Sequence, residues 1–166
     1  MKIIIEIEHL ILREHNAGDA ENAYPLNLDP DVIKYTGDDA FASIDEARTF
    51  LINYEHYIKY GFGRWIVLYK QTHEFLGWCG LKYTPELDEF DVCYRFFKKH
   101  WNKGYATEAA SACLKLGFEK FGMKTIVGRA MKKNVASIKL LEKLGLTYFE
   151  ERDCGMHDGV MYKISA

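Results

Sequence analysis

A strand-like run that passes through a short basic loop into an amphipathic helix is the feature that most constrains the fold. Phe90 to Phe97 is rich in aromatic and branched residues, as strands are, and Lys98, Lys99 and Lys103 follow it. From Ala106 onward, apolar residues recur every three or four positions, which is typical of a helix with one buried face. The loop therefore ends at a helix N-terminus, where free backbone N–H groups and the helix dipole favour an anion.

Small residues at the start of this helix make room for a ligand. Gly104 and Ala106 allow a bound group to approach the backbone, next to the lysines of the loop. The whole chain has a formal net charge of −2, so neither a nucleic acid nor an anionic membrane surface is expected as a partner. The segment is neither a P-loop nor a GxGxxG fingerprint. It predicts a site for a phosphate-bearing ligand, and an ordinary solvated lysine-rich loop is the alternative.

The N-terminal part of the chain predicts strands followed by short helices. Ile3 to Arg13 is rich in isoleucine and leucine, which indicates one or two strands. Asp19 to Tyr35 contains two prolines, so only short helical pieces are expected there. Ser43 opens a capping box. Apolar residues at helical spacing then predict one helix that ends at Gly61 and carries Ile58 on its inner face.

The remainder of the chain predicts a sheet with two further helices. Asn134 is a good N-cap for the second of these helices, which is expected to run through Leu144. Its inward positions would be Val135, Ile138 and Leu141. The expected strands are Trp65 to Tyr69, Phe75 to Tyr83, Phe90 to Phe97, Thr125 to Ala130, Thr147 to Glu151 and Val160 to Ile164. The first three form an antiparallel meander, and the whole order predicts a single α+β (mixed α/β) domain, residues 1–166, around one central sheet.

Cysteine and histidine usage argues against disulfides and against a metal site. Cys79, Cys93, Cys113 and Cys154 stand in apolar or mixed segments without CxxC or ligand spacing, so reduced, buried thiols are expected. The six histidines show no ligand spacing, so no metal is expected. The chain start is apolar for only a few residues before Glu6, which is typical of neither a signal peptide nor a membrane span. No membrane partner and a cytoplasmic location are expected.

Two segments carry a resemblance to a known family. Residues 101–109, WNKGYATEA, resemble motif A of the GNAT N-acetyltransferases. Residues 134–146, NVASIKLLEKLGL, resemble motif B of the branch that contains the RimJ/RimL ribosomal-protein N-terminal acetyltransferases. Residues 8–13 and 75–81 are like the first and third strands of that branch, so the resemblance covers most of the chain. It implies a three-layer fold in which helices flank a mostly antiparallel central sheet that splays between its fourth and fifth strands.

The resemblance implies acetyl-CoA as the cosubstrate. The pyrophosphate would lie on backbone amides of motif A, and the pantetheine arm would run along the end of the preceding strand and bond the motif B cap. The residues implied in this binding are Phe96, Phe97, Asn102, Lys103, Gly104, Tyr105, Ala106, Thr107 and Asn134. Trp101 and Asn102 stand where the family commonly has Gln or Arg and Gly, and these departures bear on the tightness of CoA binding.

The resemblance also implies catalytic roles. A backbone amide near Tyr94 to Phe96 would polarise the thioester carbonyl, and such donors are usually the largest catalytic effect. Asp91 matches the branch's frequent Glu base, with Glu89 on the same strand face as the competitor. The alternative for both is a solvated edge carboxylate. Leu141 stands where many members have the tyrosine that protonates the departing thiolate, so Ser137 is expected in that role, unless it only bonds the backbone.

These features predict transfer of an acetyl group from acetyl-CoA to a primary amine by a monomer or homodimer. The branch implies a protein N-terminal α-amine as acceptor. The alternatives are a small-molecule amine, such as a polyamine, an amino sugar or an amino acid, and a CoA-binding module without catalysis. The acceptor pocket is expected from Asp19 to Gly63 and from Cys154 to Gly159, with four candidate lining aromatics: Tyr24, Tyr35, Trp78 and Tyr83.

Overall fold

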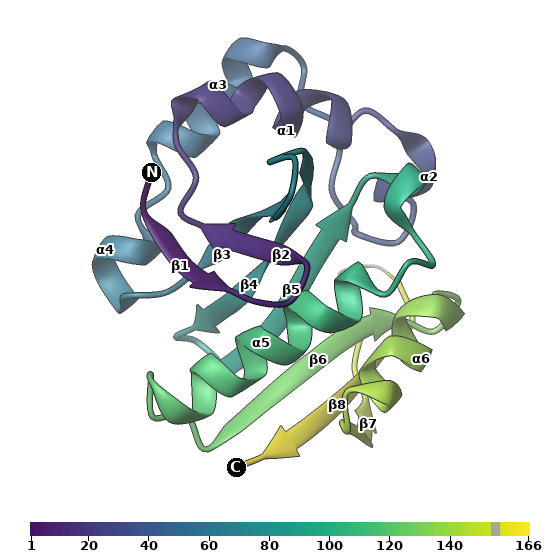
Figure 1. Ribbon diagram of the computed structural model, residues 1–166. Coiled ribbons are helices and arrows are strands. Elements are labelled where there is room, and N and C mark those ends of the chain that lie inside the picture. The colour runs from purple at the N-terminus through teal and green to yellow at the C-terminus, as the bar shows by residue number, and fades with distance from the viewer. Residues whose placement is uncertain (154–156) are drawn as a thin grey trace.

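The computed structural model describes residues 1–153 and 157–166, so Cys154 and the start of the loop expected at Cys154 to Gly159 lie outside the described residues. The strands are β1 Ile3–Glu6, β2 Leu10–Arg13, β3 Arg64–Tyr69, β4 Phe75–Thr84, β5 Glu89–Phe96, β6 Thr125–Met131, β7 Thr147–Glu151 and β8 Gly159–Ser165. The helices are α1 Ala20–Leu26, α2 Pro30–Ile33, α3 Ile44–Ile52, α4 His56–Tyr60, α5 Tyr105–Glu119 and α6 Val135–Lys143, with short 3₁₀ helices at Ala17–Asp19 and Lys98–His100. Every predicted strand is therefore present (Figure 1).

All strands form one sheet in the order β1-β2-β3-β4-β5-β6-β8-β7. The pairs from β1 to β5 are antiparallel, as the predicted meander requires, and β6, β8 and β7 are also joined antiparallel. Only β5 and β6 run parallel, and one residue pair, Asp91 with Val127, joins them. The two strands separate beyond that pair. They are the expected fourth and fifth strands, counted with Ile3 to Arg13 as one, so the mostly antiparallel, splayed sheet is confirmed.

Helices cover both faces of the sheet. On one face, α5 and α6 pack against residues such as Trp65 and Ile126, both fully buried. On the other face, α1 and α2 pack Leu26 and Val32 against Ile66 and its neighbours. Successive strand side chains point to opposite faces, so β3 is buried on both sides and reads as a continuous apolar run. The result is the expected three-layer α+β fold (Figure 1).

The single helix expected from Ser43 to Gly61 was wrong, because the structure has two. Helix α3 starts at the Ser43 cap, whose side chain accepts the Glu46 N–H, but it ends with Asn53 as its C-cap. The chain then turns Tyr54 toward the sheet, where its hydroxyl accepts the Arg64 N–H at 2.9 Å. This tertiary contact breaks the helical phase, so Ile58, expected to face inward, is 89% exposed.

Helix α6 confirms most of its predicted pattern and corrects one residue. Leu141 is buried and Ile138 packs against the core, but Val135, the first residue of α6, is exposed. The cysteines that the structure describes are free thiols, with Cys79 and Cys113 buried and Cys93 half-buried. Among the described helices, none has the length and apolar character that a membrane span requires.

Candidate active site

The N-terminus of α5 is open to an anion. Its cap residue, Gly104, has φ = 83° and no side chain caps the helix. The first backbone hydrogen bond of the helix runs from Glu108 N–H to the Gly104 carbonyl, which leaves the amides of Tyr105, Ala106 and Thr107 without intrahelical partners. A Cβ built on Gly104 would meet no atom within 4 Å. The site therefore fits the phosphate group that the sequence predicted.

The two departures from the motif A pattern keep this geometry. Asn102 adopts φ = 62°, and asparagine is among the non-glycine residues that enter this region most easily. The indole N–H of Trp101 donates to the Phe96 carbonyl at 3.0 Å, which ties the loop to the end of β5. Lys98 differs from expectation, since it pairs with Asp31 at 2.7 Å. The loop's positive charge toward a ligand then rests with Lys99 and Lys103.

Backbone amides of β5 face the splay between β5 and β6. The Phe97 N–H donates to the Leu76 carbonyl of β4, so it is already bonded. Antiparallel pairing alternates along a strand, so the amides of Tyr94 and Phe96 point away from β4 and toward β6. They lie beyond Asp91, the last residue of β5 that pairs with β6. The predicted polarising amide near Tyr94 to Phe96 thus has a free direction in which to donate.

Asp91 and Glu89, the two candidate bases, differ sharply in environment. The structure buries Asp91, which is 8% exposed, so it is not a solvated edge carboxylate, and burial raises its pKa despite the positive charges of Arg129 and Lys82. Burial of Glu89 acts in the same direction, but hydrogen bonds from Arg152 at 2.7 Å and Arg129 at 2.6 Å outweigh it and lower the pKa. Of the two carboxylates, Asp91 is the stronger proton acceptor.

Helix α6 brings Ser137 to a partner that sequence reasoning missed. The Asn134 side chain caps the helix by accepting the Ser137 N–H at 3.2 Å, and the Ser137 hydroxyl lies 2.7 Å from the Tyr94 hydroxyl. Burial raises the pKa of Tyr94 to about 12, and the hydrogen bond with Ser137 opposes that rise. Strand alternation places Tyr94 on the α5 face, but no sequence signal shows that α6 lies within its reach. The pair spans the gap between β5 and α6.

A pocket of about 420 Å³ opens on the face of the sheet opposite α5 and α6. Residues of α1, α3 and the segment 38–41 form its walls, and Arg64, Trp78 and Arg95 of the sheet line it as well. The expected region Asp19 to Gly63 thus supplies most of the walls. Of the four candidate aromatics only Trp78 lines this pocket; Tyr83 lines a separate hollow beside α4, and Tyr24 and Tyr35 line neither.

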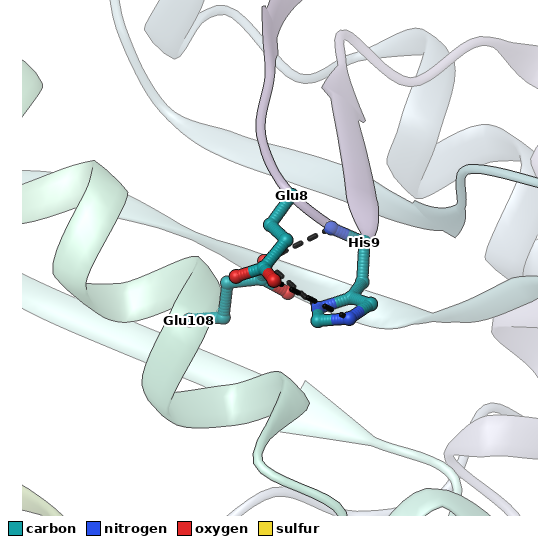
Figure 2. Close-up of side chains that lie close together, drawn as sticks. All are labelled: Glu8, His9 and Glu108. Carbon is teal, nitrogen blue, oxygen red and sulfur yellow. Dashed lines mark hydrogen bonds and ion pairs between the residues drawn. The ribbon is translucent and has the colours of Figure 1, made fainter.

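One cluster of potential metal ligands exists in the described residues. It consists of Glu8, His9 and Glu108, contributed by the β1–β2 turn and the first turn of α5 (Figure 2). The Glu108 carboxylate accepts the His9 backbone N–H at 3.0 Å and lies 3.3 Å from His9 Nδ1. These contacts fasten the turn to α5.

Comparison with known proteins identifies the family. The family described as Acetyltransferase (GNAT) domain matches residues 9–147, so the chain belongs to the GNAT acetyltransferases. It is 30% identical to the uncharacterized N-acetyltransferase p20 of Bacillus licheniformis, over 82% of this chain and 78% of that protein. The match to the uncharacterized protein YkkB of Bacillus subtilis is 40% identical, over 54% of this chain and 53% of YkkB, about half of each. The chain is thus a GNAT-type N-acetyltransferase.

A relative with a named activity is also similar. The FsC-acetyl coenzyme A-N(2)-transacetylase of Aspergillus fumigatus is 31% identical, over 75% of this chain and 57% of that protein. Among solved structures, a GNAT-family acetyltransferase from Bacillus anthracis is 27% identical, with a TM-score of 0.82 over 97% of both chains. A ribosomal-protein-S5-alanine acetyltransferase from Vibrio fischeri has a TM-score of 0.82 over 97% of this chain and 95% of its own, but at 17% identity it shows the fold alone.

Proposed function

We propose that this chain acts as one domain, residues 1–166, and transfers the acetyl group of acetyl-CoA to a primary amine with Asp91 as the base. One observation carries the proposal. Strand β5 carries the buried Asp91, which forms no ion pair within the described residues; it then separates from β6, and the chain continues from its end to the start of α5. These features are a proton acceptor, a groove and an anion site, which together match the parts of a CoA-dependent acyl transfer.

Acetyl-CoA supplies an activated acetyl thioester. The amides from Asn102 to Thr107 would hold its pyrophosphate, and Asn134 would bond the pantetheine arm beside Phe96. The Tyr94 N–H would donate to the thioester oxygen, where negative charge develops as the amine attacks. Because most of these donors belong to the backbone, changes that bend the backbone should harm binding more than changes of side chain.

The proton balance assigns the remaining roles. The acceptor nitrogen forms a bond to the carbonyl carbon while the bond from carbon to sulfur breaks. Asp91 takes the proton that the amine loses, directly or through one water, since its side chain is one methylene shorter than glutamate. Ser137 with Tyr94 returns a proton to the departing thiolate, whose thiol pKa of about 8.5 demands only a weak acid.

Two acceptor classes have support. The resemblance of residues 101–109 and 134–146 to the RimJ/RimL branch favours a protein N-terminal α-amine. The second class is a small-molecule amine, and the transacetylase of Aspergillus fumigatus, at 31% identity, is named for an acceptor other than a ribosomal protein, FsC. The walled pocket of about 420 Å³ is the size of a small-molecule site and supports the second class.

The test measures thiol release from acetyl-CoA with free-N-terminus peptides, polyamines, amino sugars and amino acids, using wild type, Asp91→Asn and Glu89→Gln. Asp91→Asn should lower kcat by roughly 100-fold or more, since general base catalysis is worth about that much, and should leave the CoA dissociation constant nearly unchanged. Glu89→Gln should keep most of the turnover per folded molecule. Unchanged turnover in Asp91→Asn, or a larger loss in Glu89→Gln, would remove Asp91 as the base.

A further inference from the structure

We propose, building on the acetyl transfer proposed above, that the acceptor is a small amine that carries a carboxylate, and that Arg64 binds this carboxylate beside Trp78. The pocket lies between the sheet and the early helices. Side chains alternate along β5, so the pocket lies on the face of the sheet opposite α5. Its charged residues indicate the charge of the ligand.

Arg64 is a cation without an acidic partner. The chain has six arginines, and five of them form an ion pair: Arg13, Arg48, Arg95, Arg129 and Arg152. Arg64 forms none with any carboxylate in the described residues, although it is half-buried and lines the pocket. Its guanidinium lies over the Trp78 ring, 4.5 Å from the centroid. A guanidinium held this way presents its donors to a ligand, and carboxylate oxygens match its fork geometry.

The sheet residues Arg64, Trp78 and Arg95 form the pocket floor. A second guanidinium, that of Arg95, adds positive charge to this floor. Arg95 is only 10% exposed and lies 5.2 Å from the same Trp78 ring. It donates to Asp38 at 2.7 Å and to Asn27 at 2.5 Å. The floor therefore holds two guanidiniums, and the one carboxylate that engages them is on Asp38, which is 55% exposed. An uncompensated charge of this kind favours an anionic ligand over a cationic one.

Three carboxylates, those of Asp38, Asp39 and Glu46, also line the pocket, and all three are exposed, whereas the two guanidiniums are more deeply buried. Burial lowers the pKa of His15 to about 4, so its ring is neutral at pH 7. Glu46 accepts the backbone N–H of Ala42, and both Glu46 and Asp39 are exposed at the rim. A polyamine would thus meet positive charge at the floor. An acceptor with one carboxylate would place it there and keep its amine free for reaction.

The floor is aligned with the proposed base. Arg64 pairs with Gly80 across β3 and β4, and Gly80 pairs with Cys93 across β4 and β5. Cys93 and Asp91 point to the same face of β5, because side chains alternate along a strand. A ligand carboxylate bound to Arg64 would therefore hold the ligand's amine on the face of the sheet where Asp91 lies. Asp91 is two residues before Cys93, the residue of β5 that aligns with Arg64.

The experiment compares matched acceptors. Wild-type protein with acetyl-CoA is given the standard amino acids, their α-amides and the corresponding decarboxylated amines, together with spermidine and a tripeptide that has a free N-terminus, an amidated C-terminus and no acidic side chain. For the best acceptor pair, kcat/KM should be at least about tenfold higher with the carboxylate than with the amide. Arg64→Gln should lose that preference, Arg64→Lys should keep part of it, and Arg48→Gln, a control of equal charge change outside the pocket, should keep all of it.

The outcomes separate this inference from the proposed function. Turnover that is equal for acids and amides, or highest for spermidine or the tripeptide, would overturn the carboxylate site and leave the acetyltransferase intact. If none of the tested amines causes thiol release, the proposed function fails. The carboxylate site is then judged by calorimetric titration of the same amino acids and amides into CoA-bound protein, where equal binding overturns it. The wild-type comparison needs no variant, so a fold defect in Arg64→Gln cannot mask the result.

Discussion

At the scale of single residues, the environment of each ionisable group decides its chemistry more than its type does. Asp91 and Glu89 are two residues apart on β5, yet their pKa values move in opposite directions. Arg129 and Arg152 hold Glu89 ionised, whereas burial disfavours the charge on Asp91. Perturbed carboxylates of this kind concentrate at functional sites, which is the physical reason for placing the base at Asp91.

A pH-dependent stability follows for Asp91. Since its pKa is raised in the native state, the folded protein binds more protons than the unfolded chain over the interval between the two pKa values. Its stabilising contribution is therefore fully present below the unfolded pKa of about 4 and is lost as pH rises through the folded pKa. Asp91→Asn should unfold at a higher temperature than wild type at pH 7, and the difference should shrink toward pH 4. A lower melting temperature for the variant at pH 7 would contradict the burial argument.

The Tyr94 hydroxyl should contribute to turnover but not to CoA binding. Tyr94→Phe removes one partner of the Ser137 hydroxyl and should lower kcat by about tenfold, because the thiolate needs only a weak acid. Tyr148→Phe, which alters a tyrosine that is 55% exposed, serves as the control. Steady-state kinetics with a CoA titration checks this, and a Tyr94→Phe enzyme with wild-type kcat would exclude the phenol from proton transfer.

At the scale of elements, the start of α5 and the divergence of β5 from β6 together form the proposed cosubstrate groove. Helix α5 buries Ala109, Ala110 and Cys113 against the sheet, which fixes the direction in which its first-turn amides point. The single residue pair between β5 and β6 leaves the rest of β5 free on that side. Both features are backbone geometry, so the conformation of a few loop residues controls them.

Substitutions at Gly104 and Asn102 test whether the conformation of the loop controls CoA binding. Gly104→Ala forces a Cβ into φ = 83°, where an L-residue is strained by about 1–2 kcal/mol, although no neighbouring atom obstructs it. The CoA dissociation constant should rise by roughly tenfold, while Asn102→Gly should leave it unchanged or lower it. Gly122 follows the other end of α5 with φ = 66° and open space, so Gly122→Ala should cost stability without affecting CoA. Calorimetric titration with CoA checks all three, and equal effects of the two alanines would argue against an anion site at Gly104.

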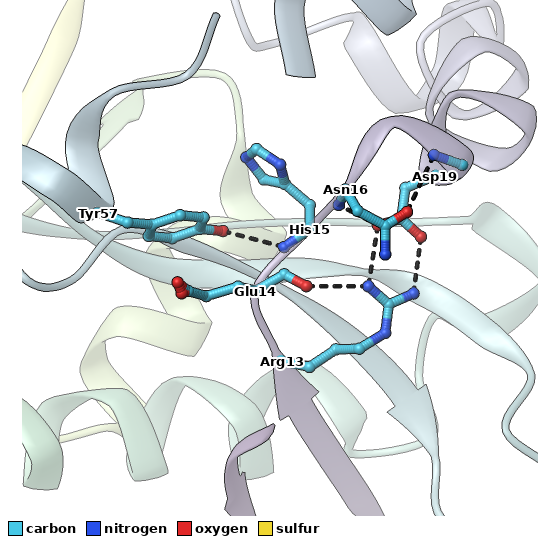
Figure 3. A network of polar contacts seen from close by, with 7 residues as sticks. Arg13, Glu14, His15, Asn16, Asp19 and Tyr57 are labelled. Atoms are coloured by element: carbon cyan, nitrogen blue, oxygen red, sulfur yellow. Dashed lines mark hydrogen bonds and ion pairs between the residues drawn. The ribbon is translucent and has the colours of Figure 1, made fainter. Parts of the chain in front are cut away.

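At the scale of the whole molecule, a buried ion pair joins the sheet to the helices that wall the proposed acceptor pocket. Arg13 ends β2, and its guanidinium donates to both carboxylate oxygens of Asp19 at 2.6 and 2.9 Å (Figure 3). The same carboxylate accepts the Asn16 N–H at 2.8 Å, and Asp19 itself stands immediately before α1. Arg13 and Asp19 are 11% and 6% exposed, so neither charge has water to replace its partner.

Breaking this pair should affect the pocket more than the cosubstrate site. Asp19→Ala leaves the Arg13 charge buried and should cost about 3–5 kcal/mol of unfolding free energy. It should also raise the KM for the acceptor more than that for acetyl-CoA, because α1 supplies pocket walls and no part of the α5 site. Chemical denaturation and steady-state kinetics measure the two effects. Glu55→Ala, which breaks an exposed pair with Lys59, should resemble wild type.

Local patterns in the sequence were sufficient for most of the elements, and they predict the anion site. Alternation and helical spacing placed each strand and α5, and Gly104 with Ala106 marked the helix start as a ligand site. These properties depend on residues close together in the chain. The same local rules failed between Ser43 and Gly61, where Tyr54 leaves the helical phase to bond the backbone of β3, a contact that periodicity does not encode.

The tertiary structure alone decided which charges meet. The order of strands in the sheet sets Arg129 and Arg152 against Glu89 and gives Asp91 no ion pair within the part of the chain that the structure describes, although both acids stand on one strand. Chain crossing brings Ser137 to Tyr94, 43 residues away, and gathers Arg64 and Arg95 around Trp78. The sequence determines where a helix or strand begins because backbone preference is local. The sequence does not show which acceptor the pocket would recognise, because burial and Coulomb interactions depend on distances that only the folded chain sets.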